Sequence, residues 1–238
     1  MGSGEEMKTE EQKLSTESQD TDQHVLTRDI AVTEWMRYGF DDLMVEFFPL
    51  EKWHYYQPFF LAQAIEKIIK AYLIGKRAGE YETLGFQKAK LKIDEIARSH
   101  SHNIRNLINA ITGSIPEVLD LLGKNYDSFS GGDFVKVLSS GYEECRYPVP
   151  RSICESYPIK GADDAYWDPL ASSGLEKFAF DLIAIVFRKI KNDYGLEISK
   201  NNWYEPYRNR ISENDWNRFC NLFFEKVFSL ETLKEKTQ

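Results

Sequence analysis

Four side chains that can bind ligands or exchange protons follow one another along a predicted helix at 57–74. Gln63, Glu66, Lys67 and Lys70 recur at i, i+3, i+4 and i+7, so they form a stripe apart from the helix's apolar stripe. In one interpretation the two lysines hold phosphate groups while Gln63 contacts a base or a ribose. In the other, Glu66 and Lys70 form an i, i+4 ion pair on a solvated face, worth a few tenths of a kcal/mol.

A second group surrounds a pair of histidines in the segment after position 97. If this segment were helical, Arg98, His102 and Arg105 would share a face at i, i+4 and i+7 and could meet one phosphate. The alternative interpretation is that Ser101 or Asn103 caps a helix and that His102 makes a structural hydrogen bond.

Two further sites carry arginines. Arg146 lies where a helix must end, because Pro148 disfavours helical geometry at Tyr147. It can bind a phosphate from the end of a bundle, or donate to helix carbonyls and hold the following loop.

The other site combines aromatic rings with cations. In one interpretation, as in proteins that bind single-stranded RNA, the rings stack on bases and the cations contact phosphates. In the other, the rings pack a C-terminal extension against the core. The residues are Trp203, Tyr204, Tyr207, Arg208 and Arg210.

Several chemistries lack their sequence signatures. Gly131-Gly132 has no following Gly-Lys-Ser/Thr, no dinucleotide fingerprint occurs, and there is no carboxylate-rich metal motif. We therefore expect no metal and no cofactor, which disfavours a conventional ATPase or metalloenzyme. Cys145, Cys154 and Cys220 are odd in number and widely spaced, which argues against a disulfide framework or a zinc site.

Composition indicates a globular protein with an acidic tail. The 238 residues are 42% hydrophobic and carry a formal net charge of −8, with seven acids against two lysines in residues 1–24. A nearly neutral remainder argues against broad, non-specific duplex binding. No apolar run approaches the roughly 20 residues of a membrane span, and the N-terminus lacks the blocks of a secretory signal. We expect a cytoplasmic protein with no membrane partner.

Helical periodicity dominates the chain, and no strand pattern or internal repeat is found. Helices are predicted at 26–48, 57–74, within 80–98, and at 102–113, 114–122, 134–142, 175–194 and 215–227, with a long loop at 146–167. Gly195 is expected to stop one helix and Asp215 to cap the last. We predict an all-α, antiparallel helical bundle at 26–195, preceded by a disordered tail at 1–25 and followed by a C-terminal helical extension at 196–238.

Three separated segments resemble the HEPN domain, a helical family named for higher eukaryotes and prokaryotes. Residues 34–43 are similar to its opening helix, and residues 60–73 resemble its most recognisable run. The third segment pairs Ser-His-Asn-Ile at 101–104 with a Tyr-to-Pro stretch at 142–148, where members often carry His-Asp-Leu and Arg-Tyr-Pro. In this order the resemblance covers about 33–194.

The resemblance implies a bundle of four or five core helices, usually dimeric, that works with nucleotides or RNA. Some members are metal-independent ribonucleases and toxins, others accompany a nucleotidyltransferase, and others are non-catalytic binding modules. In the ribonuclease branch of the family, an arginine is typically followed after about four to six residues by a histidine. Here Arg98 and His102 have only three residues between them, which is shorter than the branch pattern.

Three hypotheses follow. The first is a non-catalytic HEPN-like homodimer that binds a nucleotide or RNA, with the resemblance extending to toxin–antitoxin and nucleotidyltransferase-associated systems. Its expected ligand-binding residues, which we expect to converge on one cleft, are Gln63, Lys67, Lys70, His102, Arg105 and Arg146. The second is a metal-independent endoribonuclease with Arg98 and His102 as a shifted catalytic pair. The third is a structural or partner-docking protein, for which no nucleotide should shift the melting temperature.

Overall fold

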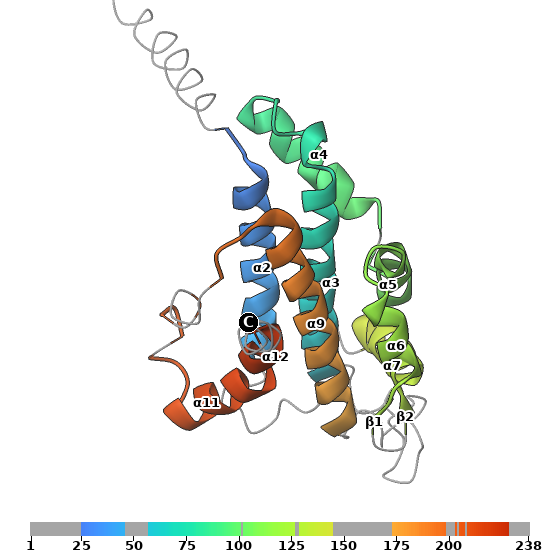
Figure 1. The fold of residues 1–238 in the computed structure, drawn as a ribbon. Coiled ribbons are helices and arrows are strands. Elements are labelled where there is room, and N and C mark those ends of the chain that lie inside the picture. The colour runs from blue at the N-terminus through green and yellow to red at the C-terminus, as the bar shows by residue number, and fades with distance from the viewer. Residues whose placement is uncertain are drawn as a thin grey trace, which may run out of the picture.

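The computed structural model describes residues 25–45, 57–100, 102–126, 129–144, 173–198, 203, 205–207 and 209–228. Three long helices lie side by side, α2 (Arg28–Met44), α3 (Gln57–Lys76) and α9 (Ser173–Tyr194), with α2 antiparallel to α3 and α9 parallel to it (Figure 1). The described part of the chain is mostly helical, which confirms the prediction of an all-α fold.

A group of shorter elements packs along another side of α3 (Figure 1). It contains α5 (Ile104–Thr112), α6 (Glu117–Gly123), β1 (Asn125–Tyr126), β2 (Phe129–Ser130) and α7 (Gly131–Glu144). The two strands pair antiparallel over two residues each. The sequence predicted no strand, because two residues are too few to show an alternating pattern.

Helix α7 begins earlier than the sequence predicted. The Gly131-Gly132 pair reads as a break, yet it forms the first turn of the helix. Ser130 and Asp133 explain this start, since the Ser130 Oγ accepts from the Asp133 amide at 3.2 Å and the Asp133 carboxylate accepts from the Ser130 amide at 3.2 Å. Glycine is needed at 131 because a Cβ there would lie 2.3 Å from the Leu121 carbonyl oxygen.

Close contact between α2 and α3 depends on Gly39. A Cβ at this position would lie 2.6 Å from Cγ1 of Ile68 and 3.1 Å from the carbonyl oxygen of Ala64.

The side chain of Thr27 caps α2 by accepting from the Ile30 amide. Helix α3 is buried along most of its length, because α2, α9, α5 and α7 all pack on it.

Helix α9 stops where the sequence predicted. Gly195 adopts a φ of +67°, the left-handed geometry that ends many helices, and its amide donates to the Lys191 carbonyl. Just before it, the Tyr194 hydroxyl donates to the Tyr72 carbonyl at 2.7 Å, which fastens the end of α9 to α3.

The C-terminal extension packs on the bundle through aromatic rings. Helices α11 (Glu213–Leu222) and α12 (Phe224–Phe228) lie at the other end of α2 and α9 (Figure 1). Phe40 of α2 is fully buried, with ring centroids of Trp203 and Phe219 at 5.0 and 5.2 Å. The predicted cap at Asp215 is wrong, because Ser212 is the N-cap and accepts from the Asp215 amide at 3.1 Å.

A second, smaller core lies under α4 (Phe86–Arg98) and the 3-10 turn η4 (Ala78–Glu80), at one end of the bundle (Figure 1). Half of its eight buried residues are alanines. They are Ala31, Ile74, Ala78, Tyr81, Ala89, Ile93, Ile96 and Ala97.

Some predictions fall outside the described residues. These are the tail at 1–25 apart from Val25, the end of the first helix at Pro49, the loop at 146–167, and the boundary residue Arg146.

Candidate functional site

An ion pair is buried on α3, facing the connection between α4 and α5. Lys70 Nζ lies 2.7 Å from Glu66 Oε1, one helical turn away, and the two residues are only 3% and 4% exposed. The sequence predicted this pair as a solvated one in its structural interpretation. The surrounding helices instead enclose it, so its energetics are those of a buried pair rather than a surface pair.

His102 contacts the same carboxylate from a different element. Its Nδ1 lies 2.9 Å from Glu66 Oε1, while 65% of the side chain remains exposed. Glu66 thus joins a buried ammonium to a solvent-facing imidazole through one oxygen. If the ring carries its proton on Nδ1, the carboxylate accepts that hydrogen bond and orients the ring.

The position of His102 follows from where two helices end. Helix α4 ends at Arg98 and α5 begins at Ile104, with Asn103 as its N-cap accepting from the Asn106 amide at 3.1 Å. The helical face proposed for Arg98, His102 and Arg105 is therefore not formed. The alternative interpretation, a cap at Asn103 with a hydrogen-bonded His102, matches the structure.

Glu66 is left with unmet hydrogen-bonding capacity. Its Oε2 is buried and has no hydrogen-bond partner among the described residues. Burying a carboxylate oxygen without a partner costs free energy, and such groups gather at functional sites. Glu66 is the central residue of the site, yet it was not among the predicted ligand-binding residues.

Lys67 points to a different neighbour. Its Nζ lies 2.5 Å from Oδ2 of Asp42 on α2, and both side chains are partly buried. Burial raises the pKa of Asp42, and the ammonium of Lys67 offsets part of this effect. Gln63 lies one turn before Lys67 on α3 and is half-buried.

The two arginines near His102 are exposed. Arg98 is the last residue of α4 and Arg105 the second residue of α5. Neither forms an ion pair with any residue that the structure describes. Their two guanidinium groups, which lie close to His102 along the chain, can therefore bind an anion.

His100 lies near Lys70 and Arg77, although no sequence motif pointed to it. Burial, together with the positive charges of Arg77 and Lys70, lowers the pKa of His100 below its ordinary value. His100 therefore favours its neutral form more than a solvated histidine does. Arg77 and His100 are functional candidates that sequence reasoning missed, although Arg77 lies seven residues after Lys70, just past the end of α3.

The C-terminal aromatic and cationic cluster has its rings inside the protein. Trp203 and Tyr207 are buried against Phe40, and the Tyr207 hydroxyl donates to Asp41. Arg210 is exposed. The two rings serve packing, as the structural interpretation predicted, while Tyr204, Arg208 and the more distant Arg146 lie outside the described residues.

Within the described ranges, no three or more His, Cys, Asp or Glu side chains gather as metal ligands. In the same ranges, each helix is too short or too polar to cross a membrane. Comparisons with protein-family models, curated proteins and solved structures find no match.

Proposed function

We propose that this protein is a HEPN-like helical module that binds RNA or a nucleotide without cutting it, at the site formed by Glu66, Lys70 and His102. The supporting observation is the buried Glu66–Lys70 pair. Among the residues that the structure describes, the second Glu66 carboxylate oxygen has no hydrogen-bond partner, and the first contacts an exposed histidine. A buried ionic group with unmet hydrogen bonds lowers stability unless something completes it. A polar ligand that reaches Glu66 and Lys70 beside His102 would do so.

Phosphate recognition is assigned to the arginines on either side of the histidine. Arg98 and Arg105 are exposed, and within the described residues no carboxylate neutralises them. Arginine presents a planar fork of donors that matches phosphate oxygens. Lys67 is less available, because Asp42 already holds it.

Binding is tested by the fluorescence anisotropy of a labelled single-stranded RNA in EDTA, over a series of salt concentrations. Arg105→Gln should weaken binding and reduce the slope of log K against log salt by about 0.7, the value for one phosphate contact on a single strand. Arg218→Gln is the matched control, since Arg218 lies on α11 at a distance from α5 (Figure 1). Absence of binding to RNA, and of any thermal shift with mononucleotides, would favour the partner-docking hypothesis instead.

A metal-independent endoribonuclease is the second candidate, favoured by the contact of 2.9 Å between Glu66 Oε1 and His102 Nδ1. A carboxylate in this position orients the imidazole ring, so that Nε2 of His102 can face a ribose hydroxyl or a leaving oxygen and move a proton there. Arg98 would stabilise the phosphate charge. Incubation of RNA with the protein in EDTA separates the candidates, because cleavage that is lost in His102→Ala would establish the enzyme.

The assembly and setting of the protein are also proposals, and they rest on the family resemblance. They comprise a homodimer, a nucleotidyltransferase-type partner in a toxin–antitoxin or related system, and a cytoplasmic location. Light scattering of the purified protein tests the first. Co-purification with the product of a neighbouring nucleotidyltransferase gene tests the second.

A further inference from the structure

Helix α4 has weaker apolar anchoring than the rest of the bundle. We call this helix, residues 86–98, the α4 unit, and it rests on the small core described above. Four of the eight residues in that core are alanines, whereas the main core contains many fully buried aromatic rings. Because apolar stabilisation grows with the area buried, the α4 unit is held less strongly than α3 or α9.

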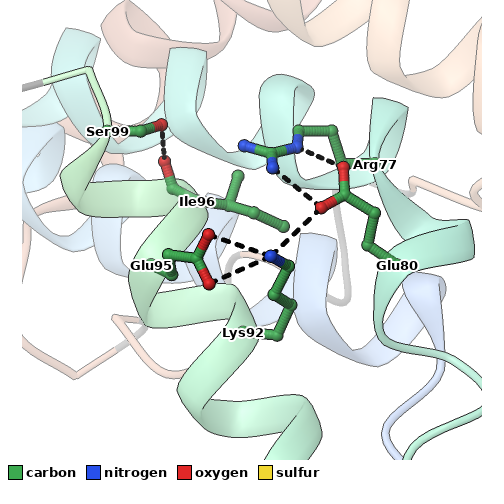
Figure 2. Close-up of polar contacts among 6 residues, drawn as sticks. All are labelled: Arg77, Glu80, Lys92, Glu95, Ile96 and Ser99. Atoms are coloured by element: carbon green, nitrogen blue, oxygen red, sulfur yellow. Dashed lines mark hydrogen bonds and ion pairs between the residues drawn. The ribbon is translucent and has the colours of Figure 1, made fainter.

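Surface ion pairs supply part of the missing attachment. Arg77, which follows the last residue of α3, is bonded to Glu80, and Lys92 of α4 contacts both Glu80 and Glu95 (Figure 2). The Arg77–Glu80 distances are 2.5 and 2.7 Å, and Lys92 Nζ lies 3.4 Å from Glu80 and 2.9 Å from Glu95. All four side chains are partly exposed, so dissolved salt screens their attraction. The contact of Lys92 with Glu80 ties helix α4 to η4.

A buried group in the small core works against docking. The Tyr81 ring is fully buried, and its hydroxyl has no hydrogen-bond partner among the described residues. The hydroxyl is hydrated when the unit opens and is unpaired when it closes. This difference favours the open state relative to a phenylalanine at the same position.

The α4 unit also leads directly to the candidate site. Its last residue, Arg98, is followed within four residues by His100 and His102, and His102 reaches Glu66 on α3. Any movement of α4 away from the end of α3 therefore pulls on the segment that presents His102.

From these observations we propose that the α4 unit opens as one local unit while the main bundle stays folded, and that opening withdraws His102 from Glu66. The effect on a ligand rests on the function proposed above. The opening itself is a property of the free protein and is measured without a ligand.

Native-state hydrogen exchange, followed by mass spectrometry, tests the opening. Amides in the interior of α4 should exchange on the order of 100-fold faster than those in the interior of α9. Raising NaCl from about 0.05 M to about 0.5 M should accelerate exchange in α4 more than in α9. Helix α9 also carries exposed ion pairs, at Lys189 and at Glu176, but it is held by the large main core. Equal protection of α4 and α9 would overturn the proposal.

Three variants test the assigned causes. Tyr81→Phe should slow exchange in α4 by about tenfold, since it removes the unpaired buried hydroxyl. Lys92→Gln should accelerate it by about threefold. Lys88→Gln makes the same charge change one turn earlier on α4, where the lysine is exposed and forms no ion pair with the described residues, and should leave exchange unchanged. Equal effects of the two lysine variants, or faster exchange in Tyr81→Phe, would contradict the proposal.

The link to His102 is tested by adding a single-stranded RNA at about 100 times its Kd. If ligand binding requires the docked unit, exchange in α4 should slow by roughly 100-fold. Binding without such protection would overturn the withdrawal of His102 while leaving the proposed function intact. If neither RNA nor a mononucleotide binds, the proposed function fails, and the exchange data on the free protein still decide whether the α4 unit opens.

Discussion

Each side of helix α3 pairs a lysine with a carboxylate, but the two pairs lie in different environments. Toward α2, Lys67 meets Asp42 across two helices, next to a core of interlocking aromatic rings. Toward α5, Lys70 meets Glu66 inside the protein, one carboxylate oxygen stays unpaired, and His102 remains largely in solvent. On the first side, Lys67 offsets part of the cost of burying Asp42, and both side chains keep some contact with solvent. The second side lowers the stability of the free protein, which is the pattern expected of a site that a ligand completes.

Removing packing on the first side should have the largest effect. Phe40→Ala should lower the free energy of unfolding by about 4 kcal/mol, because it leaves a cavity among Trp203, Phe219 and Phe223. Urea denaturation followed by far-UV circular dichroism measures the change. RNA binding by the folded variant should be unaffected, and a loss below about 1 kcal/mol would show that the extension does not pack as described.

The two lysines of α3 give the next largest contrast. Lys70→Met should cost about 3 kcal/mol, because it leaves the Glu66 carboxylate buried without its ammonium. Lys67→Met should cost about 1 kcal/mol or less, since Lys67 and Asp42 keep some contact with solvent.

The double variant Glu66→Leu/Lys70→Met separates charge burial from lost packing. It should recover much of the stability lost in Lys70→Met, because no uncompensated charge remains in the interior. Equal losses in Lys67→Met and Lys70→Met would remove the distinction between the two sides of α3.

The sequence was sufficient to place most helices, although not the start of α7 or the cap of α11, and it was not sufficient for the site. Apolar spacing located α3 and α9, and Gly195 marked the end of α9, because these signals are local in sequence. The cap at Asn103 already implied a break before α5, and this break is incompatible with a helical face through Arg98, His102 and Arg105.

The burial of Glu66 and Lys70 was not predictable from the α3 sequence. Periodicity assigns charged residues to the solvated stripe, while their burial depends on helices that follow much later in the chain. The pairing of Lys67 with Asp42 is likewise non-local, since 25 residues separate them. A single sequence carries no direct signal for either contact.

A pH series should show a smaller effect at Asp42. Because burial raises its pKa in the folded protein, the folded state binds a proton more tightly than the unfolded chain does. This contribution to stability is complete below the ordinary pKa of an aspartate and is lost as pH rises through the raised value.

Asp42→Asn, which does not ionise, provides the reference for that series. The stability of the wild type relative to this variant should fall as pH rises from below the ordinary pKa of an aspartate through the raised pKa of Asp42, and level off above it. Thermal or urea unfolding over this range measures the difference. A relative stability that rises with pH would show that the attraction of Lys67 outweighs burial.

The smallest effect on stability is expected where the effect on function is greatest. His102→Ala should change the free energy of unfolding by no more than about 0.5 kcal/mol, because the ring is mostly exposed and Lys70 still neutralises Glu66. The same variant should weaken RNA binding, or abolish cleavage if the protein is a ribonuclease. His102→Gln, which can still hydrogen-bond to Glu66, should retain more binding than His102→Ala but no proton transfer. A large loss of stability in both variants, with binding unchanged, would assign His102 to the architecture and leave the unpaired oxygen of Glu66 without a functional explanation.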